Sequence, residues 1–271
     1  MESFCFKEFN VRQSSSAMKV NTDGVLLGAW LMLPSYFTEP LLRENVKVLD
    51  IGTGTGVIAL IIAQRLSKLH TAPSFFIEAI DIDKPSVDEA NYNFSQSPWA
   101  EHLIANEMSL QDMEKAQNTE KYDLIVSNPP YFIDSLKSPS ARRSSARHNH
   151  DLPYEVIIEA ATKMLKSDGR LAVVLPADEG EKFISLTKAE LVTTLHLARR
   201  CRVKTLAGKK EKRYLLEFVK SEEQKISAEQ HNTAAETYPT PVEEALIMQE
   251  TGGLEYTEQY KNFTREFYLK F

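Results

Sequence analysis

The middle of the chain alternates short apolar runs with longer helical patterns, and this alternation constrains the fold more than any other feature. Apolar runs typical of buried strands lie at 46–51, 75–81, around 104, 122–127 and 171–175. Helical patterns are found at 57–69, 85–95, 152–166 and 179–190. Strands and helices that alternate at this spacing form βαβ units, in which the strands are parallel. We therefore expect an α/β fold with a mostly parallel sheet and helices on both faces.

The last third of the chain is expected to complete this sheet. Apolar runs at 192–198 and 214–219 flank a basic segment, so we expect an antiparallel strand pair at the sheet edge and seven strands in total. Residues 221–241 are polar and predict a flexible excursion, whereas the aromatic residues of 256–271 are expected to pack back on the core. Because 271 residues can bury one large core, we predict a single domain over 1–271.

Composition narrows the class of protein. Cys5 and Cys201 are too few for a disulfide framework and do not stand at metal-ligand spacing. The N-terminus lacks the basic and apolar regions of a signal peptide, and the longest apolar run, 57–63, is too short to span a membrane. We expect a cytoplasmic monomer that binds neither a membrane nor a metal.

Charge is segregated along the chain, whose net charge is −6. Residues 199–213 hold eight basic residues against one acid, and 137–150 hold four with no acid, whereas 222–258 hold nine glutamates against one lysine. Basic patches are one mark of nucleic-acid binding, although charge runs are often only solvated surface. The candidate RNA-binding residues are Arg142, Arg143, Arg147, Lys209, Lys210, Lys212 and Arg213.

A glycine-rich turn, Asp50 to Gly56, joins the first strand of the expected sheet to its first helix. Open α/β sheets place their ligand crevice at such a turn, and glycines allow close approach of the backbone. The sixth position counted from Gly52 is Val57, so the dinucleotide fingerprint fails, and no Lys-Ser/Thr pair of a phosphate-binding loop follows. NAD and ATP are therefore disfavoured. Asp81, which ends the next strand, can accept hydrogen bonds from both hydroxyls of a ribose or cap a helix, and Asp83 is the better cap.

The sequence Asn128-Pro129-Pro130-Tyr131 follows a strand and is the most informative stretch of the chain. The Asn128 side-chain oxygen and the Pro129 carbonyl can each hold one N–H of a conjugated amine, which aims the nitrogen lone pair at an electrophile. Prolines stiffen the turn and remove competing donors. An aromatic residue such as Tyr131 can stack on a planar base. A turn that merely stops a strand is the simpler alternative.

Both motifs resemble those of class I S-adenosylmethionine-dependent methyltransferases, and the proline turn is similar to that of the amino-group enzymes. The resemblance implies a Rossmann-like fold and S-adenosylmethionine as cofactor. It places Gly52, Gly54 and Gly56 of the glycine turn against the amino acid part of the cofactor, Asp81 on its ribose and Ile82 on its adenine face. The cofactor-binding candidates are Lys19, Thr22, Asp50, Gly52, Gly54, Gly56, Asp81, Ile82, Ser109 and Asn128; the catalytic candidates are Asn128, Pro129, Pro130 and Tyr131.

The N-terminus carries a more specific resemblance. Residues 6–9 and 17–30, with further stretches at 96–101, 142–147, 212–218 and 267–269, resemble the bacterial valine-tRNA adenine N6-methyltransferase family, which modifies the adenine just 3′ of the anticodon, position 37. The resemblance implies a tRNA partner, and that residues 1–45 form part of the cofactor site, with Lys19 and Thr22 over the methionine end. A helix start capped by Thr22 or Asp23 would explain the same residues. Ser109 stands where the family usually has an acid near the cofactor adenine, so Glu107 or Asp112 are alternatives for that contact.

Other functions share the proline turn. Ribosomal-RNA guanine-N2 enzymes tend to have Phe where this chain has Tyr131, and protein glutamine-N5 enzymes carry a helical domain for which the 47 residues before Val48 lack room. Adenine is therefore favoured over guanine and glutamine. An RNA chaperone that binds the cofactor without turnover is the alternative from another class of protein, and an Asn128→Ala substitution distinguishes it, since only an enzyme has a rate to lose.

Overall fold

The computed structural model describes residues 3–33, 45–69, 74–116, 122–130, 152–189, 194–221 and 239–270. Within these ranges the strands are β1 (Ser3–Cys5), β2 (Asn10–Arg12), β3 (Asn45–Ile51), β4 (Ser74–Asp81), β5 (Leu103–Glu107), β6 (Tyr122–Ser127), β7 (Leu165–Pro176), β8 (Leu195–Leu206), β9 (Arg213–Lys220) and β10 (Val242–Gln249). The α-helices are α1 (Thr22–Trp30), α2 (Val57–Ser67), α3 (Lys84–Ser95), α4 (Leu110–Ala116), α6 (Tyr154–Met164), α7 (Ala177–Ala189) and α8 (Glu258–Thr264), and a 3-10 helix, η2, spans Ala100–His102.

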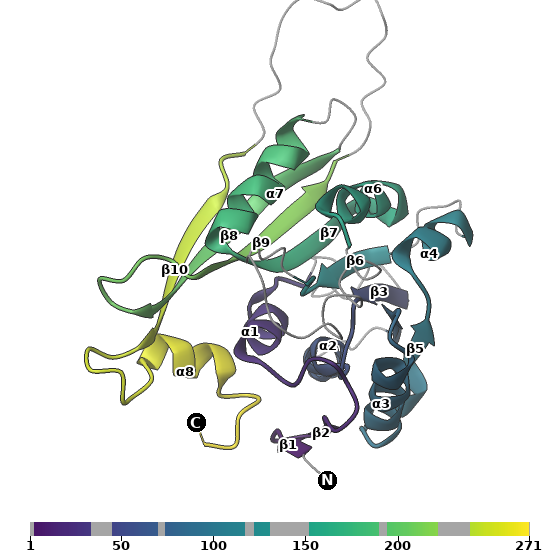
Figure 1. Ribbon diagram of the computed structural model, residues 1–271, viewed down its shortest axis with the longest axis horizontal. Helices are drawn as coiled ribbons and strands as arrows, with labels where there is room; N and C mark the ends of the chain where they lie inside the picture. Colours follow the sequence, from purple (N-terminus) through teal and green to yellow (C-terminus); the bar gives the residue numbers. More distant parts are fainter. Residues whose placement is uncertain are drawn as a thin grey trace, which may run out of the picture.

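A central sheet of eight described strands runs in the order β10-β8-β9-β7-β6-β3-β4-β5 (Figure 1). The five strands from β7 to β5 are mutually parallel. Ile51, at the end of β3, pairs with Ile80 on one side and with Ser127 on the other. The carboxyl ends of β3, β4 and β6 therefore meet at one point of the sheet, as the βαβ pattern predicts.

Helices cover both faces of this sheet. Along β3, Val46 and Val48 pack into a core shared with α1, α2 and α3, whereas Leu49 and Ile51 pack into a second core under α4, α6 and α7. Successive side chains of a strand point to opposite faces, so a strand covered on both sides reads as a continuous apolar run. The expected mostly parallel α/β fold is confirmed.

The antiparallel end of the sheet is longer than expected. β9 pairs antiparallel with both β7 and β8, as the two apolar runs predict. It lies inside the sheet rather than at its edge, because β8 and then β10 continue the sheet beyond it. The sheet therefore has eight strands in the described part of the chain, rather than the expected seven, and residues 199–204 of the basic segment belong to β8 itself.

Charge explains why part of the acidic segment forms the outermost strand. β10 pairs parallel with β8, in a register that brings Glu243 and Glu244 beside the arginines of that strand. Arg199 binds Glu244 at 2.8 Å, and Arg200 and Arg202 both bind Glu243. Opposite charges on neighbouring strands stabilise the pairing. The expected flexible excursion at 221–241 falls mainly on residues 222–238, which lie outside the described ranges.

The C-terminal residues pack on the core, as expected, with Tyr260 and Phe267 buried there, and they also contact the N-terminal residues. Phe6 and Tyr268 form an isolated β-bridge with stacked rings, and the Lys7 N–H donates to the Phe267 carbonyl at 2.9 Å. No helix in the described ranges is long and apolar enough to cross a membrane.

Candidate active site at the carboxyl edge of the sheet

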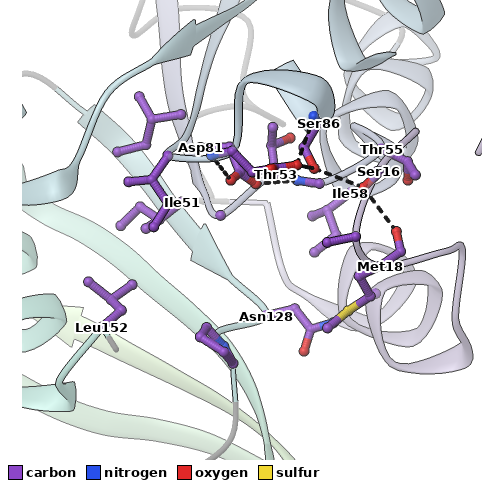
Figure 2. A pocket seen from close by; sticks show the side chains of 18 of the residues that line it. Ser16, Met18, Ile51, Thr53, Thr55, Ile58, Asp81, Ser86, Asn128 and Leu152 are labelled. Atoms are coloured by element: carbon purple, nitrogen blue, oxygen red, sulfur yellow. Dashed lines mark hydrogen bonds between the residues drawn. The ribbon is translucent and has the colours of Figure 1, made fainter. Parts of the chain in front are cut away.

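A cavity of about 520 Å³ opens where the carboxyl ends of β3, β4 and β6 meet. This volume falls within the range of sites that bind small organic ligands. The predicted site residues that line the cavity are Lys19, Gly52, Gly54, Asp81, Ile82, Ser109, Asn128 and Pro130. Figure 2 shows Asp81 and Asn128, from different strand ends, on the wall of the same space.

Some predicted site residues do not line this cavity. They include Thr22, Asp50, Gly56 and Pro129, which lie in the described ranges. Tyr131 and the basic residues Arg142, Arg143 and Arg147 fall at 131–151, outside the described residues.

The glycine turn has the backbone shape that its sequence predicts. Gly52, Gly54 and Gly56 have φ angles of 69°, 55° and 81°, a region that side chains other than glycine rarely adopt. The N–H groups of Gly52 and Thr53 donate to the Ile80 carbonyl at 2.9 and 3.0 Å, which fixes the turn against the end of β4. A Cβ on Gly56 would lie 2.5 Å from the Phe94 ring. Gly56 therefore serves packing of the turn against α3, while Gly52 and Gly54 face the cavity.

Asp81 presents a carboxylate at the cavity wall. Its Oδ2 accepts from the Gly54 N–H and its Oδ1 from the Asp83 N–H, both at 2.9 Å. Burial raises the pKa of Asp81 above its usual range, and these backbone N–H groups oppose that shift. A carboxylate has about four acceptor sites in total, so Asp81 can still accept from a further donor. Asp83 caps α3 through its bond from the Ser86 N–H, as predicted.

Asp50 lies beneath the glycine turn. Its side chain is fully buried, its Oδ2 accepts from the Thr53 hydroxyl at 2.7 Å, and its Oδ1 has no hydrogen-bond partner among the described residues. Burial raises the pKa of Asp50 to about 7, although the Thr53 bond favours the charged form. Asp50 therefore shapes the turn from behind and places a titratable group next to the cavity.

Asn128 begins the turn that follows β6. The preceding residue, Ser127, is fully buried and donates its hydroxyl to the Ile51 carbonyl at 2.9 Å, which ties the ends of β6 and β3 together. Pro129 is buried and Pro130 is exposed, so the prolines anchor the turn on one side and leave the other side open. With fixed φ angles they hold Asn128 at the cavity wall.

The N-cap of α1 is a different residue from the two that the sequence suggests. Asn21, not Thr22 or Asp23, is the N-cap, and its side chain accepts from the Gly24 N–H at 2.9 Å. Asn21 fits this role because a short side chain with an oxygen can reach the free N–H groups of the first turn. Asn21 and Lys19 line the cavity, whereas Asp23 pairs with Arg213.

Ser109, which lines the cavity, forms two hydrogen bonds with Asp112. Its hydroxyl donates to the Asp112 carboxylate at 2.7 Å and accepts from the Asp112 N–H at 3.1 Å, in the manner of an N-cap for α4. Ser109 and Gln111 line the cavity, but Glu107 and Asp112 do not. Asp112, one of the two alternatives for the family's usual acid, therefore reaches the cavity only through its hydrogen bonds with Ser109.

Sequence reasoning missed several lining residues. They are Ser16, Met18, Asn21, Ser86, Met108 and Leu152. Ser16 and Ser86 belong to segments 70 residues apart, yet their hydroxyls lie 3.0 Å from each other, as Figure 2 shows. Such a contact leaves no periodic signal in the sequence, because it depends on how a loop crosses α3. Within the described ranges, no group of three or more His, Cys, Asp or Glu residues is arranged to hold a metal.

The basic residues separate into two classes. Arg199, Arg200 and Arg202 are held in ion pairs with acids of β10. The turn between β8 and β9 carries three lysines that are exposed and have no ion pair within the described residues: Lys209, Lys210 and Lys212. β9 begins opposite the end of β7, since Arg213 pairs with Pro176. This lysine turn, Lys209 to Lys212, therefore lies at the same sheet edge as the cavity.

Comparisons with known proteins agree with this architecture. A likeness to a protein from Agrobacterium tumefaciens named as a "predicted O-methyltransferase" has a TM-score of 0.58 at 14% identity and covers 90% of this chain and 96% of the other. A protein from Listeria monocytogenes, assigned by its description to the class I S-adenosylmethionine-dependent methyltransferases, gives 0.53 at 14% identity and covers 87% of this chain and 67% of the other. At these identities the likeness shows the fold alone.

Sequence comparison is more specific. Residues 27–200 match the family model described as the methyltransferase small domain. Relatives from Bacteroides thetaiotaomicron, Flavobacterium psychrophilum and Tolumonas auensis are each 36% identical, and the matches cover 98–99% of this chain and 97–99% of the relatives. All three are named tRNA1(Val) (adenine(37)-N6)-methyltransferase. A glycine turn, a strand-end aspartate and an Asn-Pro-Pro turn on one cavity, together with similarity over nearly the whole length, establish that this chain belongs to the tRNA1(Val) (adenine(37)-N6)-methyltransferase family.

Proposed function

We propose that the chain transfers a methyl group from S-adenosylmethionine to N6 of the adenine at position 37 of a valine tRNA. One observation carries the proposal: Asn128 and Pro130 of the proline turn line the same cavity as Gly52, Gly54 and Asp81. The proline turn, which can orient an amine, therefore faces the same cavity as the glycine turn and Asp81, which suit a nucleoside cofactor. The names of the relatives supply the identity of the substrate.

The cavity residues fit the cofactor. The carboxylate of Asp81 lines the cavity, and because each carboxylate oxygen can accept more than one hydrogen bond, it can also accept from ribose hydroxyls. The glycine turn leaves room, since a Cβ on Gly52 would have no neighbour within 4 Å. Ile82, which is 42% exposed, offers an apolar surface to a purine. When bound, S-adenosylmethionine supplies an electrophilic methyl group.

The proline turn would hold the target amine. The Asn128 side-chain oxygen and the Pro129 carbonyl accept the two N–H groups of the adenine amine, and the nitrogen lone pair is then directed into the cavity. Proline has no N–H of its own, so the turn offers acceptors without competing donors. Tyr131 follows directly and would stack on the extruded base. No metal or general base is needed to orient the nitrogen in this arrangement.

Two further groups of residues would complete the site. Residues 16–21, in the N-terminal extension over 1–45, would cover the methionine end of the cofactor through Lys19 and its neighbours. The lysine turn, together with Arg142, Arg143 and Arg147, would bind phosphates of the anticodon arm. The enzyme would act as a monomer in the cytoplasm.

The test is transfer of labelled methyl from S-adenosylmethionine to total unmodified tRNA, followed by nucleoside analysis. We expect N6-methyladenosine in valine tRNA only, at position 37. Label in guanine of ribosomal RNA or in a protein glutamine would keep the fold and overturn the substrate. Binding of tRNA with no transfer, for both the unchanged chain and Asn128→Ala, would identify an RNA-binding protein without turnover.

A further inference from the structure

We propose that Glu89 is a positioning residue for the cofactor: it fastens residues 14–16 of the N-terminal extension to α3 and so builds one wall of the cavity. The inference deepens the proposed function and rests on it. No motif pointed to Glu89, which stands in the middle of α3 on a stretch with no recognisable signature.

The Glu89 carboxylate is fully buried and takes its donors from another part of the chain. Its Oε1 accepts from the Ser14 N–H at 2.8 Å and its Oε2 from the Ser16 N–H at 2.8 Å. The Ser15 N–H lies 3.1 Å from both oxygens. Three consecutive backbone N–H groups thus converge on one carboxylate, an arrangement that backbones adopt around anions.

Hydrogen bonds and a neighbouring positive charge favour the ionised form of this carboxylate. Burial alone would raise the pKa of Glu89, but the N–H groups of Ser16, Ser14 and Ser15 and the side chain of Arg12 hold it below its usual range. Arg12 Nε lies 3.2 Å from Oε1, and its guanidinium rests 4.3 Å from the centre of the Tyr92 ring. The negative charge is therefore compensated within the contact.

The same face of α3 holds both the extension and the glycine turn. One turn after Glu89, Asn93 accepts from the Arg12 N–H at 2.8 Å and donates to the carbonyls of Arg12 and Thr55 at 2.9 Å. One turn before it, the Ser86 hydroxyl lies 3.0 Å from that of Ser16. Residues three and four apart share a helix face, so Ser86, Glu89 and Asn93 form one row.

This row determines where the cavity wall stands. Ser16 lines the cavity, and its hydroxyl bonds the Met18 carbonyl at 3.1 Å, as Figure 2 shows. Met18, Lys19 and Asn21 follow on the same wall. Glu89 does not line the cavity and so acts on a ligand only through this segment. Loss of the carboxylate leaves three N–H groups without their acceptor, and the wall loses its fixed position.

The test compares Glu89→Gln, which keeps the shape and removes the charge, with Asp88→Asn. Asp88 is the neighbouring acid on α3, is 61% exposed and pairs with Lys84 at the surface. We measure S-adenosylmethionine affinity by calorimetry, hydrogen exchange of residues 14–16, and KM for each substrate. We expect Glu89→Gln to weaken cofactor binding about tenfold, since a buried hydrogen-bond network with one partner lost costs that much affinity. Exchange at 14–16 should rise, KM for the cofactor should rise and KM for tRNA should not change.

Asp88→Asn should leave every one of these values unchanged. Ser14→Pro removes one backbone donor on the exposed segment and should also weaken cofactor binding. Ser14→Ala keeps that donor and should leave cofactor binding unchanged. These two variants test the proposal if Glu89→Gln does not fold. A folded Glu89→Gln variant with unchanged cofactor affinity overturns the inference, because a purely structural residue would lower the melting temperature alone. If the unchanged chain does not bind S-adenosylmethionine, the proposed function is wrong and this inference falls with it.

Discussion

The guanidinium of Arg213 forms an ion pair with the carboxylate of Asp23, and both side chains are more than four-fifths buried. The pair joins the first residue of β9 to the first turn of α1. The sequence makes Arg213 a candidate for phosphate binding, because it ends the basic segment 199–213. Its place inside the molecule points to a different role, holding α1 and the adjoining cavity wall against the sheet.

Arg213→Ala should therefore lower stability more than it lowers RNA affinity. Removing one partner of a buried ion pair leaves the other charge without compensation, and we expect a loss of about 3 kcal/mol in the free energy of unfolding. Denaturant unfolding measures this. The double variant, Arg213→Ala with Asp23→Asn, should regain part of this free energy, because the unpaired carboxylate is then absent. Additive effects of the two substitutions would contradict the coupling.

The lysine turn should contribute to RNA binding through charge. Replacing Lys209, Lys210 and Lys212 by Ala should lower tRNA affinity and reduce the slope of log affinity against log salt by about 2 to 3, since about 0.9 counterions are released per phosphate contact. Arg202→Ala is the control, because Arg202 already pairs with Glu243. A slope that stays at the wild-type value in the triple variant would remove the turn from the interface.

Asn128→Ala should separate chemistry from binding. Loss of one preorganised hydrogen-bonding group at a reacting centre reduces kcat by about 100-fold, and we expect that drop with tRNA affinity intact. Single-turnover methylation and filter binding measure the two quantities. Asn262→Ala, at an exposed position of α8, should change neither. Equal losses of rate and RNA affinity in Asn128→Ala would show that Asn128 acts in binding instead.

Asp50 should make stability depend on pH. Folded Asp50 keeps its proton up to about pH 7, whereas the unfolded group releases it near 3.8. The folded state thus binds the extra proton between these values, so this group's contribution is complete below about pH 4 and is lost as the pH rises to 7, by about 4 kcal/mol.

Asp50→Asn, which cannot ionise, should lack this loss, and its stability relative to the unchanged chain should increase from pH 4 to pH 7. Urea unfolding at a series of pH values measures the difference. Asp88→Asn, at an exposed position, should follow the unchanged chain throughout. Parallel curves for Asp50→Asn and the unchanged chain would place the Asp50 pKa at its ordinary value.

The buried strands and their order of connection could be predicted from sequence because each strand carries its own signal. β6 spans the residues that the apolar run predicts, and α3 begins at a predicted acidic cap. The strand β10 could not be predicted in this way. Two glutamates, Glu243 and Glu244, interrupt its apolar residues, and they pair with arginines of β8 more than 40 positions earlier in the chain.

The sequence by itself determined the α/β fold, the glycine turn, Asp81 and the proline turn, since each depends on neighbouring residues and on backbone rules that act locally. Tertiary structure alone decided which of these residues share a cavity, that Arg213 faces inward and that Glu89 receives the N–H groups of Ser14 to Ser16. The physical reason is distance along the chain. A hydrogen bond or ion pair between segments more than 70 residues apart forms only after the sheet has brought them together, and its partners have no common pattern in the sequence.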